Sequence, residues 1–192
     1  RVAGLDLQNA PSKARGRIGY MAQKFSLYGD LSVGQNLDFF AGVYGLTGKA
    51  RRTAITQMID TFGFANRLNV NASGLPLGYK QRLALACAVM HDPDVLFLDE
   101  PTSGVDPRTR REFWTHINAM VANGVTIMVT THFLDEAEYC DRMALIYRSK
   151  MIASGSPDAL KDQVRASGIA DPTLEDAFIA LVEQSDRERE AA

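Results

Sequence analysis

The sequence predicts an α/β fold in which helices flank a parallel sheet. Short apolar segments of strand length alternate with longer segments whose apolar residues recur every three or four positions. One apolar segment, residues 95–98, is followed directly by two carboxylates, Asp99 and Glu100. Because a buried parallel strand presents ligand-binding groups at its carboxyl end, the acidic pair is expected to lie in a functional site. With 192 residues, 46% of them hydrophobic, the chain can bury the core of one domain.

Before the acidic pair, the sequence predicts short strands and two amphipathic helices. The strands are predicted over 2–7 and 17–21, with a turn at 11–13. Ser32 and Gln35 form the Ser-x-x-Gln pattern of a capping box, which predicts that a helix begins there. A second helix is predicted over 50–62, closed by Gly63. These two helices are expected to form a helical insert.

Beyond the acidic pair, strands and helices alternate. Asp106 is placed to cap a helix that begins with Pro107 and ends before Gly124. The later elements are predicted as a strand over 125–131, a helix over 134–140, a hairpin of 143–147 with 151–154, and helices over 157–165 and 172–183. Residues 185–192 are highly charged, and we expect this tail to be disordered.

Composition limits the classes of function. The formal net charge of −2 gives no electrostatic reason to expect nucleic acid as a partner. Since no apolar run approaches the roughly 18 residues needed to cross a bilayer, any membrane role is expected to come through a partner. Cys87 and Cys140 lie on predicted helices without metal-ligand spacing, which favours a reduced, cytosolic protein over a disulfide scaffold.

The acidic pair belongs to a longer motif. Residues 99–106 are Asp-Glu-Pro-Thr-Ser-Gly-Val-Asp. Together with the apolar strand before it, this segment resembles the Walker B strand and D-loop of an ABC transporter ATP-binding domain. Gln23, the segment 75–82 and His132 stand where that family has its Q-loop glutamine, signature motif and switch histidine. The resemblance covers nearly the whole chain and is greatest to the bacterial multidrug and sodium export branch.

The resemblance implies a P-loop NTPase-like core, a helical subdomain, and a role for each matched residue. Asp99 is expected to hold Mg²⁺ through water, with Gln23 completing the metal sphere. Glu100 is expected to orient or deprotonate the attacking water, and His132 to contact that water and the γ-phosphate. The residues expected to contact ATP are Gln23, Leu75, Leu77, Gly78, Tyr79 and Asp106.

The signature motif departs from the family pattern of Leu-Ser-Gly-Gly-Gln. Pro76 replaces the serine, Leu77 the first glycine and Tyr79 the glutamine, while Leu75 and Gly78 remain. In the family this serine meets the γ-phosphate of the nucleotide held by the opposite subunit. One hydrogen bond to a charged phosphate is worth about 1.5–3 kcal/mol, so its loss is expected to slow the site without necessarily silencing it.

A phosphate loop, Gly-x-x-x-x-Gly-Lys-Ser/Thr, does not occur in these 192 residues. The nearest segment, 42–50, has glycines one residue too far apart and ends in Ala50 instead of a hydroxyl residue. We therefore expect an N-terminally truncated domain, and we expect the isolated fragment to be inactive.

These expectations combine into one organisation and one function. The predicted parts are the core up to the Q-loop at 1–31, the helical subdomain at 32–74, the signature and remaining core at 75–156, and C-terminal helices with a charged tail at 157–192. The resemblance implies an ATP-hydrolysing subunit, peripheral on the cytoplasmic face of the inner membrane, that powers the export of drugs or ions. Its expected partners are transmembrane permease subunits and a second ATP-binding domain arranged head to tail, without nucleic acid.

Two alternatives remain open at this stage. One is a soluble ABC-type ATPase that acts on nucleic acid or the ribosome. The other is a degenerate regulatory module that binds nucleotide without hydrolysis. The segment 25–28, beside Gln23, is either a docking edge for a permease helix or a filler of the subdomain joint.

Overall fold

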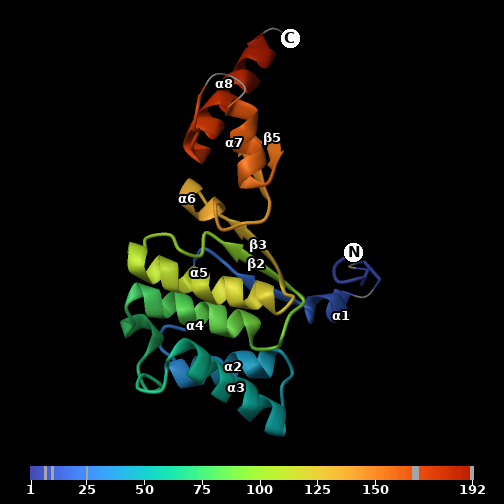
Figure 1. The fold of residues 1–192 in the computed structure, drawn as a ribbon. Coiled ribbons are helices and arrows are strands. Elements are labelled where there is room, and N and C mark those ends of the chain that lie inside the picture. Colours follow the sequence, from blue (N-terminus) through green and yellow to red (C-terminus); the bar gives the residue numbers. More distant parts are fainter. Residues whose placement is uncertain (7, 10, 25, 166–168, 191–192) are drawn as a thin grey trace. The chain divides into compact units, whose positions relative to one another are not determined.

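A computed structural model describes residues 1–6, 8–9, 11–24, 26–165 and 169–190 (Figure 1). Leu7, Phe25 and residues 191–192, which belong to predicted segments, lie outside the described residues. The chain divides into two compact units, residues 1–130 and 131–192. The finer four-part division expected from the sequence stays a prediction.

The first unit contains a three-stranded parallel sheet in the order β1-β2-β3. Its strands are β1 (Ile18–Met21), β2 (Val95–Asp99) and β3 (Thr126–Thr130), and its helices are α1 (Pro11–Arg15), α2 (Val33–Val43), α3 (Gly48–Phe62), α4 (Leu77–Val89) and α5 (Pro107–Ala122), with a 3₁₀ turn over Ala72–Gly74. The predicted parallel sheet flanked by helices is confirmed. All three strands therefore present their carboxyl ends at the same edge.

One face of this sheet is buried and the other carries exposed side chains. Leu96 and Leu98 of β2 are at most 1% exposed and belong to the buried core. On the opposite face, Tyr20, Phe97 and Met128 stand in register across the three strands. Tyr20 is 59% exposed and Met128 is 58% exposed. Helices α4 and α5 run side by side in the same unit (Figure 1).

Local capping sets the ends of the helices in the insert. The Ser32 hydroxyl accepts from the Gln35 N–H, and the Gln35 side chain accepts from the Ser32 N–H, which confirms the capping box. Helix α3 ends at Gly63, whose φ of +72° is the left-handed conformation that glycine adopts without strain. The two predicted helices of the insert are thus confirmed.

The buried side chain of Asn36 ties the loop before α2 to the helix itself. Its amide nitrogen donates to the carbonyl oxygens of Tyr28, Leu31 and Ser32 at 3.0–3.1 Å. Its amide oxygen accepts from the Tyr28 N–H at 2.9 Å. Asn36 is fully buried, so no water replaces these partners if the amide is removed.

We expect Asn36→Leu to lower the free energy of unfolding by about 2–3 kcal/mol, because it removes the acceptor of the Tyr28 N–H and the amide that donates to three loop carbonyl oxygens. Urea unfolding of the full-length protein measures the change. Asn118→Leu on the exposed side of α5 is the matched control and is expected to change stability by less than about 0.5 kcal/mol. Equal stability of the two variants would contradict the bonding assigned to Asn36.

Two predictions for the N-terminal segment are wrong. Val2 and Leu5 exchange backbone hydrogen bonds across a tight turn, because Ala3 and Gly4 both have positive φ, so the described part of 2–7 forms no strand. Residues 11–13, predicted as a turn, begin helix α1. Proline is common in turns and also at the first position of a helix, because its fixed φ matches the backbone there.

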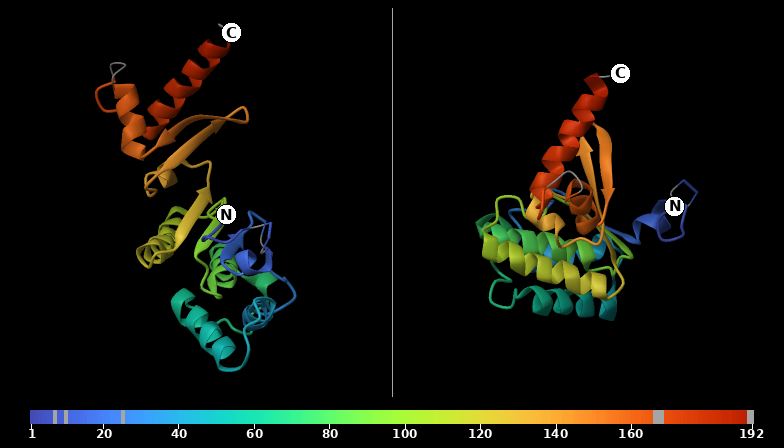
Figure 2. Two further views of the ribbon diagram at one scale, coloured as in Figure 1. Left: turned by 90° about the vertical axis from the view of Figure 1, so that its right-hand side faces the viewer. Right: turned by 45° about the horizontal axis from the view of Figure 1, so that its top comes forward.

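The second unit packs helices against an antiparallel hairpin (Figure 2). Its elements are α6 (Leu134–Ala137), β4 (Met143–Tyr147), β5 (Lys150–Gly155), α7 (Pro157–Arg165) and α8 (Leu174–Glu190). Its core is formed by Ala137, Leu145, Leu160 and Leu174. The hairpin turns at Arg148 and Ser149, which both have positive φ, as the right-handed twist of a two-residue turn requires.

Two further predictions fail in this unit. The predicted helix 134–140 ends at Ala137, because the N–H groups of Tyr139 and Cys140 bond to the third residue before them and tighten the chain into a turn. Residues 185–190, predicted as disordered, continue α8. Gln184 bonds to Glu188 across one turn of that helix, and Asp186 accepts from the Tyr147 hydroxyl at 3.1 Å. None of the helices in the described ranges is long and apolar enough to cross a membrane.

Candidate active site

The carboxyl edge of the parallel sheet brings together the acidic pair and the predicted Q-loop glutamine. Asp99 is the last residue of β2, Glu100 follows it, and Gln23 lies two residues beyond β1. The Gln23 amide nitrogen donates to Glu100 Oε2 at 2.7 Å. Residues far apart in the chain therefore meet at this edge.

Thr130, the last residue of β3, contacts both carboxylate residues. Its hydroxyl donates to Asp99 Oδ1 at 2.5 Å, and its carbonyl accepts from the Glu100 N–H at 3.0 Å. Thr130 is not among the site residues predicted from the sequence. The signal was present, however, because pairing the predicted strand 125–131 in parallel with the Asp99 strand places Thr130 beside Asp99.

The backbone of Glu100 is held in an uncommon conformation, with a φ of +44°. In a regular strand, consecutive side chains point to opposite faces, so Asp99 and Glu100 would be separated. The left-handed turn at Glu100 interrupts that alternation. For a residue other than glycine it costs on the order of 1–3 kcal/mol, and the hydrogen bonds to Thr130 help to hold it.

The donor groups at this edge fit a magnesium ion held jointly with a phosphate. Mg²⁺ prefers hard oxygen ligands and is commonly bound by one or two carboxylates together with water and substrate phosphates. Asp99 supplies a carboxylate, and Gln23 supplies an amide oxygen that its hydrogen bond to Glu100 does not use. Within the described ranges, no cluster of three or more His, Cys, Asp or Glu residues could hold a metal by protein groups alone.

The signature segment opens helix α4 against the loop that follows the acidic pair. Pro76 is the N-cap residue and gives no side-chain hydrogen bond. A Cβ on Gly78 would lie 2.4 Å from Thr109 Cγ2 in α5, so a larger residue would require the Thr109 side chain to shift. Leu77 is 40% exposed, whereas Leu75 is 4% exposed and packs in the core. Of these two leucines, Leu77 is the one accessible to a ligand.

Gln81 joins helix α4 to the same loop. It is 2% exposed, and its amide nitrogen lies 3.4 Å from the carbonyl oxygen of Ser103. Leu77 Cδ2 lies 3.4 Å from the position that a Cβ of Gly104 would take. The signature segment and the loop after Glu100 are therefore packed together.

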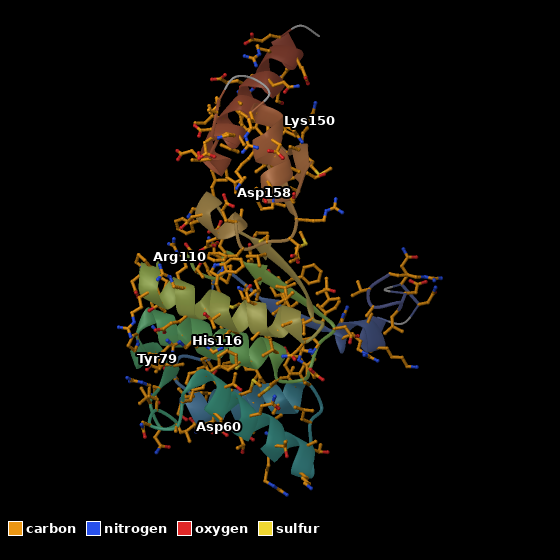
Figure 3. The ribbon with its side chains drawn as sticks, in the orientation of Figure 1. Asp60, Tyr79, Arg110, His116, Lys150 and Asp158 are labelled. Carbon is orange, nitrogen blue, oxygen red and sulfur yellow. The ribbon has the colours of Figure 1, made fainter. Side chains whose placement is uncertain are left out.

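Tyr79, which stands where the family has glutamine, lies near the start of helix α4 (Figure 3). Two arginines contact its ring. The guanidinium of Arg67 lies 4.2 Å from the ring centroid, and that of Arg82 lies 5.1 Å from it. Arg82 also forms an ion pair with Glu112. Arg67 is not among the predicted site residues, because its contact with Tyr79 joins a loop to a helix without any local pattern.

Asp106 caps helix α5, as predicted. Its carboxylate accepts from the N–H groups of Arg108 and Thr109 at 3.1 and 3.0 Å. Hydrogen bonds from the Thr109 side chain and backbone, and from Arg108, lower the pKa of the Asp106 carboxyl group. Because the pKa is lower in the folded state, the cap stabilises the protein above the ordinary aspartate pKa and is lost as the pH falls through the lowered value.

His132 belongs to the second unit, where it is exposed and its ring lies 4.1 Å from that of Phe133. The group formed by Gln23, Asp99, Glu100 and Thr130 belongs to the first unit. The role of His132 as the switch histidine stays a prediction.

A parallel α/β core with an acidic pair at its carboxyl edge is the arrangement of an ATP-binding domain, and comparison with known proteins agrees. The sequence family described as ABC transporter matches residues 1–103, more than half of the chain. The chain therefore belongs to the ABC transporter family, as part of its ATP-binding domain.

Its relatives include ATP-binding proteins of exporters. It is 62% identical over 187 residues to the probable multidrug ABC transporter ATP-binding protein YbhF of Escherichia coli, covering 97% of this chain and 32% of YbhF. It is 36% identical to the Nod factor export ATP-binding protein I of Burkholderia lata, covering 96% of this chain and 63% of that protein. It is also 36% identical to the daunorubicin resistance ATP-binding protein DrrA2 of Streptomyces coeruleorubidus, covering 94% and 56%. The chain thus spans less than two thirds of each of these proteins.

Solved structures confirm the fold. The ATP-binding subunit of an ABC transporter superposes with a TM-score of 0.78 at 26% identity, covering 93% of this chain and 74% of that subunit. The cbiO1 protein of Clostridium perfringens, part of the ABC transporter complex cbiONQ, gives a TM-score of 0.70 at 29% identity, covering 80% and 64%.

Proposed function

We propose that the full-length protein is an ATP-hydrolysing subunit that powers an ABC export permease, of drugs or ions. The observation that carries this proposal is the hydrogen-bonded group of Gln23, Asp99, Glu100 and Thr130 at the carboxyl edge of the parallel sheet. The names of the relatives, which refer to multidrug and Nod factor export and to daunorubicin resistance, support the export class.

The geometry suits phosphoryl transfer to water. This reaction needs neutralised phosphate charge and a water held in line with the bond that breaks. Asp99 and Gln23 would hold Mg²⁺, which supplies the charge neutralisation when bound. Glu100, held next to them, would orient the attacking water and accept its proton. His132 would contact the γ-phosphate.

The signature segment would act on a nucleotide held by a second ATP-binding domain in a head-to-tail dimer. The exposed Leu77, with Gly78 and Tyr79, would contact that nucleotide from the start of helix α4, where helix N–H groups favour an anion. A regulatory module that binds ATP without hydrolysis is the second candidate, because Pro76 replaces the serine and its hydroxyl. Measuring phosphate release by the full-length protein decides between this module and the ATP-hydrolysing subunit.

A permease would dock beside Gln23. Tyr28 is 49% exposed and Phe39 is 40% exposed, and their rings pack edge to face at 4.6 Å. Aromatic side chains of this kind are enriched at interfaces. The subunit would then lie on the cytoplasmic face of the inner membrane. Co-purification of the full-length protein with a membrane subunit separates this assignment from a soluble ATPase acting on nucleic acid or the ribosome.

The 192-residue chain alone is expected to bind Mg²⁺–ATP with a dissociation constant weaker than about 1 mM, because these residues include no phosphate loop to cradle the phosphates. Isothermal titration calorimetry measures the affinity, with the full-length protein as the positive control and circular dichroism to check that the chain is folded. Micromolar binding by the folded 192-residue chain would contradict the expectation.

A further inference from the structure

The contact between Gln23 and Glu100 follows from the register of the parallel sheet. Met21 of β1 pairs with Leu98 of β2, and Gln23 and Glu100 each lie two residues beyond that pair. Neighbouring strands are about 4.8 Å apart, so side chains at matched positions past the strand ends can meet. Gln23 and Glu100 make such a contact, a hydrogen bond of 2.7 Å from Gln23 Nε2 to Glu100 Oε2.

The side-chain amide of Gln23 can donate a hydrogen bond through its nitrogen while its oxygen binds a cation. Its nitrogen donates two hydrogens, and its oxygen is an acceptor that can also bind a hard cation. In this structure the nitrogen end of Gln23 faces the carboxylate of Glu100. Since each carboxylate oxygen has two lone pairs, accepting from Gln23 does not remove the capacity of Glu100 to take a proton.

We propose that Gln23 is a positioning residue for Glu100: its amide N–H holds the carboxylate in the orientation in which it receives the water proton, while its amide oxygen serves the metal. This inference rests on the proposed hydrolysis of ATP. It gives the Q-loop residue of this chain a second task, separate from metal binding.

The physical reason is the reach of the Glu100 side chain. Hydrogen bonds to Thr130 hold the backbone of Glu100, and its half-buried side chain places the carboxylate beyond three rotatable bonds. General-base catalysis needs the carboxylate within hydrogen-bond reach of the water, and small misplacements are costly to rate. A short bond from an adjacent strand end restricts the carboxylate where the backbone cannot.

Substitutions of Gln23 in the full-length protein can separate the role of the amide nitrogen from the role of the amide oxygen. Gln23→Glu keeps an oxygen for the metal and removes the N–H donor. We expect it to lower turnover at saturating Mg²⁺–ATP by about tenfold or more while the affinity for Mg²⁺–ATP stays within about threefold. Gln23→Met removes donor and oxygen without adding charge, and we expect both turnover and affinity to fall. Gln57→Glu, an exposed site on α3, is the control and is expected to change neither.

The inference is overturned if Gln23→Glu keeps turnover within threefold, or if turnover and affinity fall in the same proportion. It is also overturned if Gln23→Met retains turnover at saturating nucleotide, since the loss in Gln23→Glu would then come from charge repulsion. In the Glu100→Gln background, Gln23→Glu should lower the residual turnover by less than threefold, because Gln23 acts through Glu100. A loss as large as that in the parent protein would show that Gln23 acts independently of Glu100. If the parent protein does not hydrolyse ATP, or if Glu100→Gln is fully active, the proposed function fails instead.

Discussion

Replacement of Glu100 by glutamine in the full-length protein is expected to lower ATP turnover by about 10²- to 10⁴-fold, the usual contribution of a positioned general base. The amide has nearly the same shape as the carboxylate and can still accept a hydrogen bond from Gln23, but it cannot take a proton from water. ATP affinity should therefore change little, because the substitution removes an interaction needed in the transition state.

Steady-state phosphate release and equilibrium binding of ATP measure the two quantities separately. Glu175→Gln, an exposed position in the first turn of α8, makes the same chemical change away from the acidic pair and should leave both unchanged. Turnover that is unaffected by Glu100→Gln would rule out Glu100 as the base. A parent protein that binds ATP without any turnover would instead favour the regulatory module.

The second large effect is expected from Gly19→Val in strand β1. A Cβ at this position would lie 2.5 Å from the carbonyl oxygen of Ala88 and 2.8 Å from Leu96 Cδ1. The first contact is with the backbone of helix α4, which cannot move aside as the end of a side chain can. We expect a loss of about 3 kcal/mol or more in the free energy of unfolding, and displacement of the strand that leads to Gln23.

Urea unfolding of the full-length protein measures this loss. Gly16→Val is a suitable control, because the nearest atoms to its Cβ position are at 3.6 Å, an ordinary van der Waals contact, and we expect a change below about 1 kcal/mol. If Gly19→Val were as stable as this control, strand β1 would not pack closely against the backbone of α4.

Local chemistry made parts of the fold predictable. Ser32 with Gln35, and Asp106 with Pro107, mark the starts of α2 and α5, since a helix cap depends on residues within one turn. Asp99 and Glu100 mark a strand end, because an apolar run followed by two acids has few other stable placements in a parallel sheet. The roles of these acids came from family resemblance, which spacing alone does not supply.

The remaining features depend on contacts between residues distant in the sequence. Residues 185–190 have the charge of a disordered tail, yet Asp186 bonds to Tyr147 of the hairpin and the helix continues. The contact of Arg67 with Tyr79 also depends on packing that no local pattern encodes. Propensity predicts an element from its own residues, and tertiary contacts then extend or shorten it.

We propose that Asp99, Glu100 and Gln23 form the metal and water side of an ATP-hydrolysis site. The decisive experiment is a structure of the full-length Glu100→Gln variant with Mg²⁺ and ATP. We predict Mg²⁺ bound to the γ-phosphate with the Gln23 amide oxygen at about 2.1 Å and Asp99 linked through water. The Gln23 nitrogen should remain within about 3 Å of the side chain at position 100. Nucleotide bound with its metal away from Asp99 and Gln23 would contradict the claim.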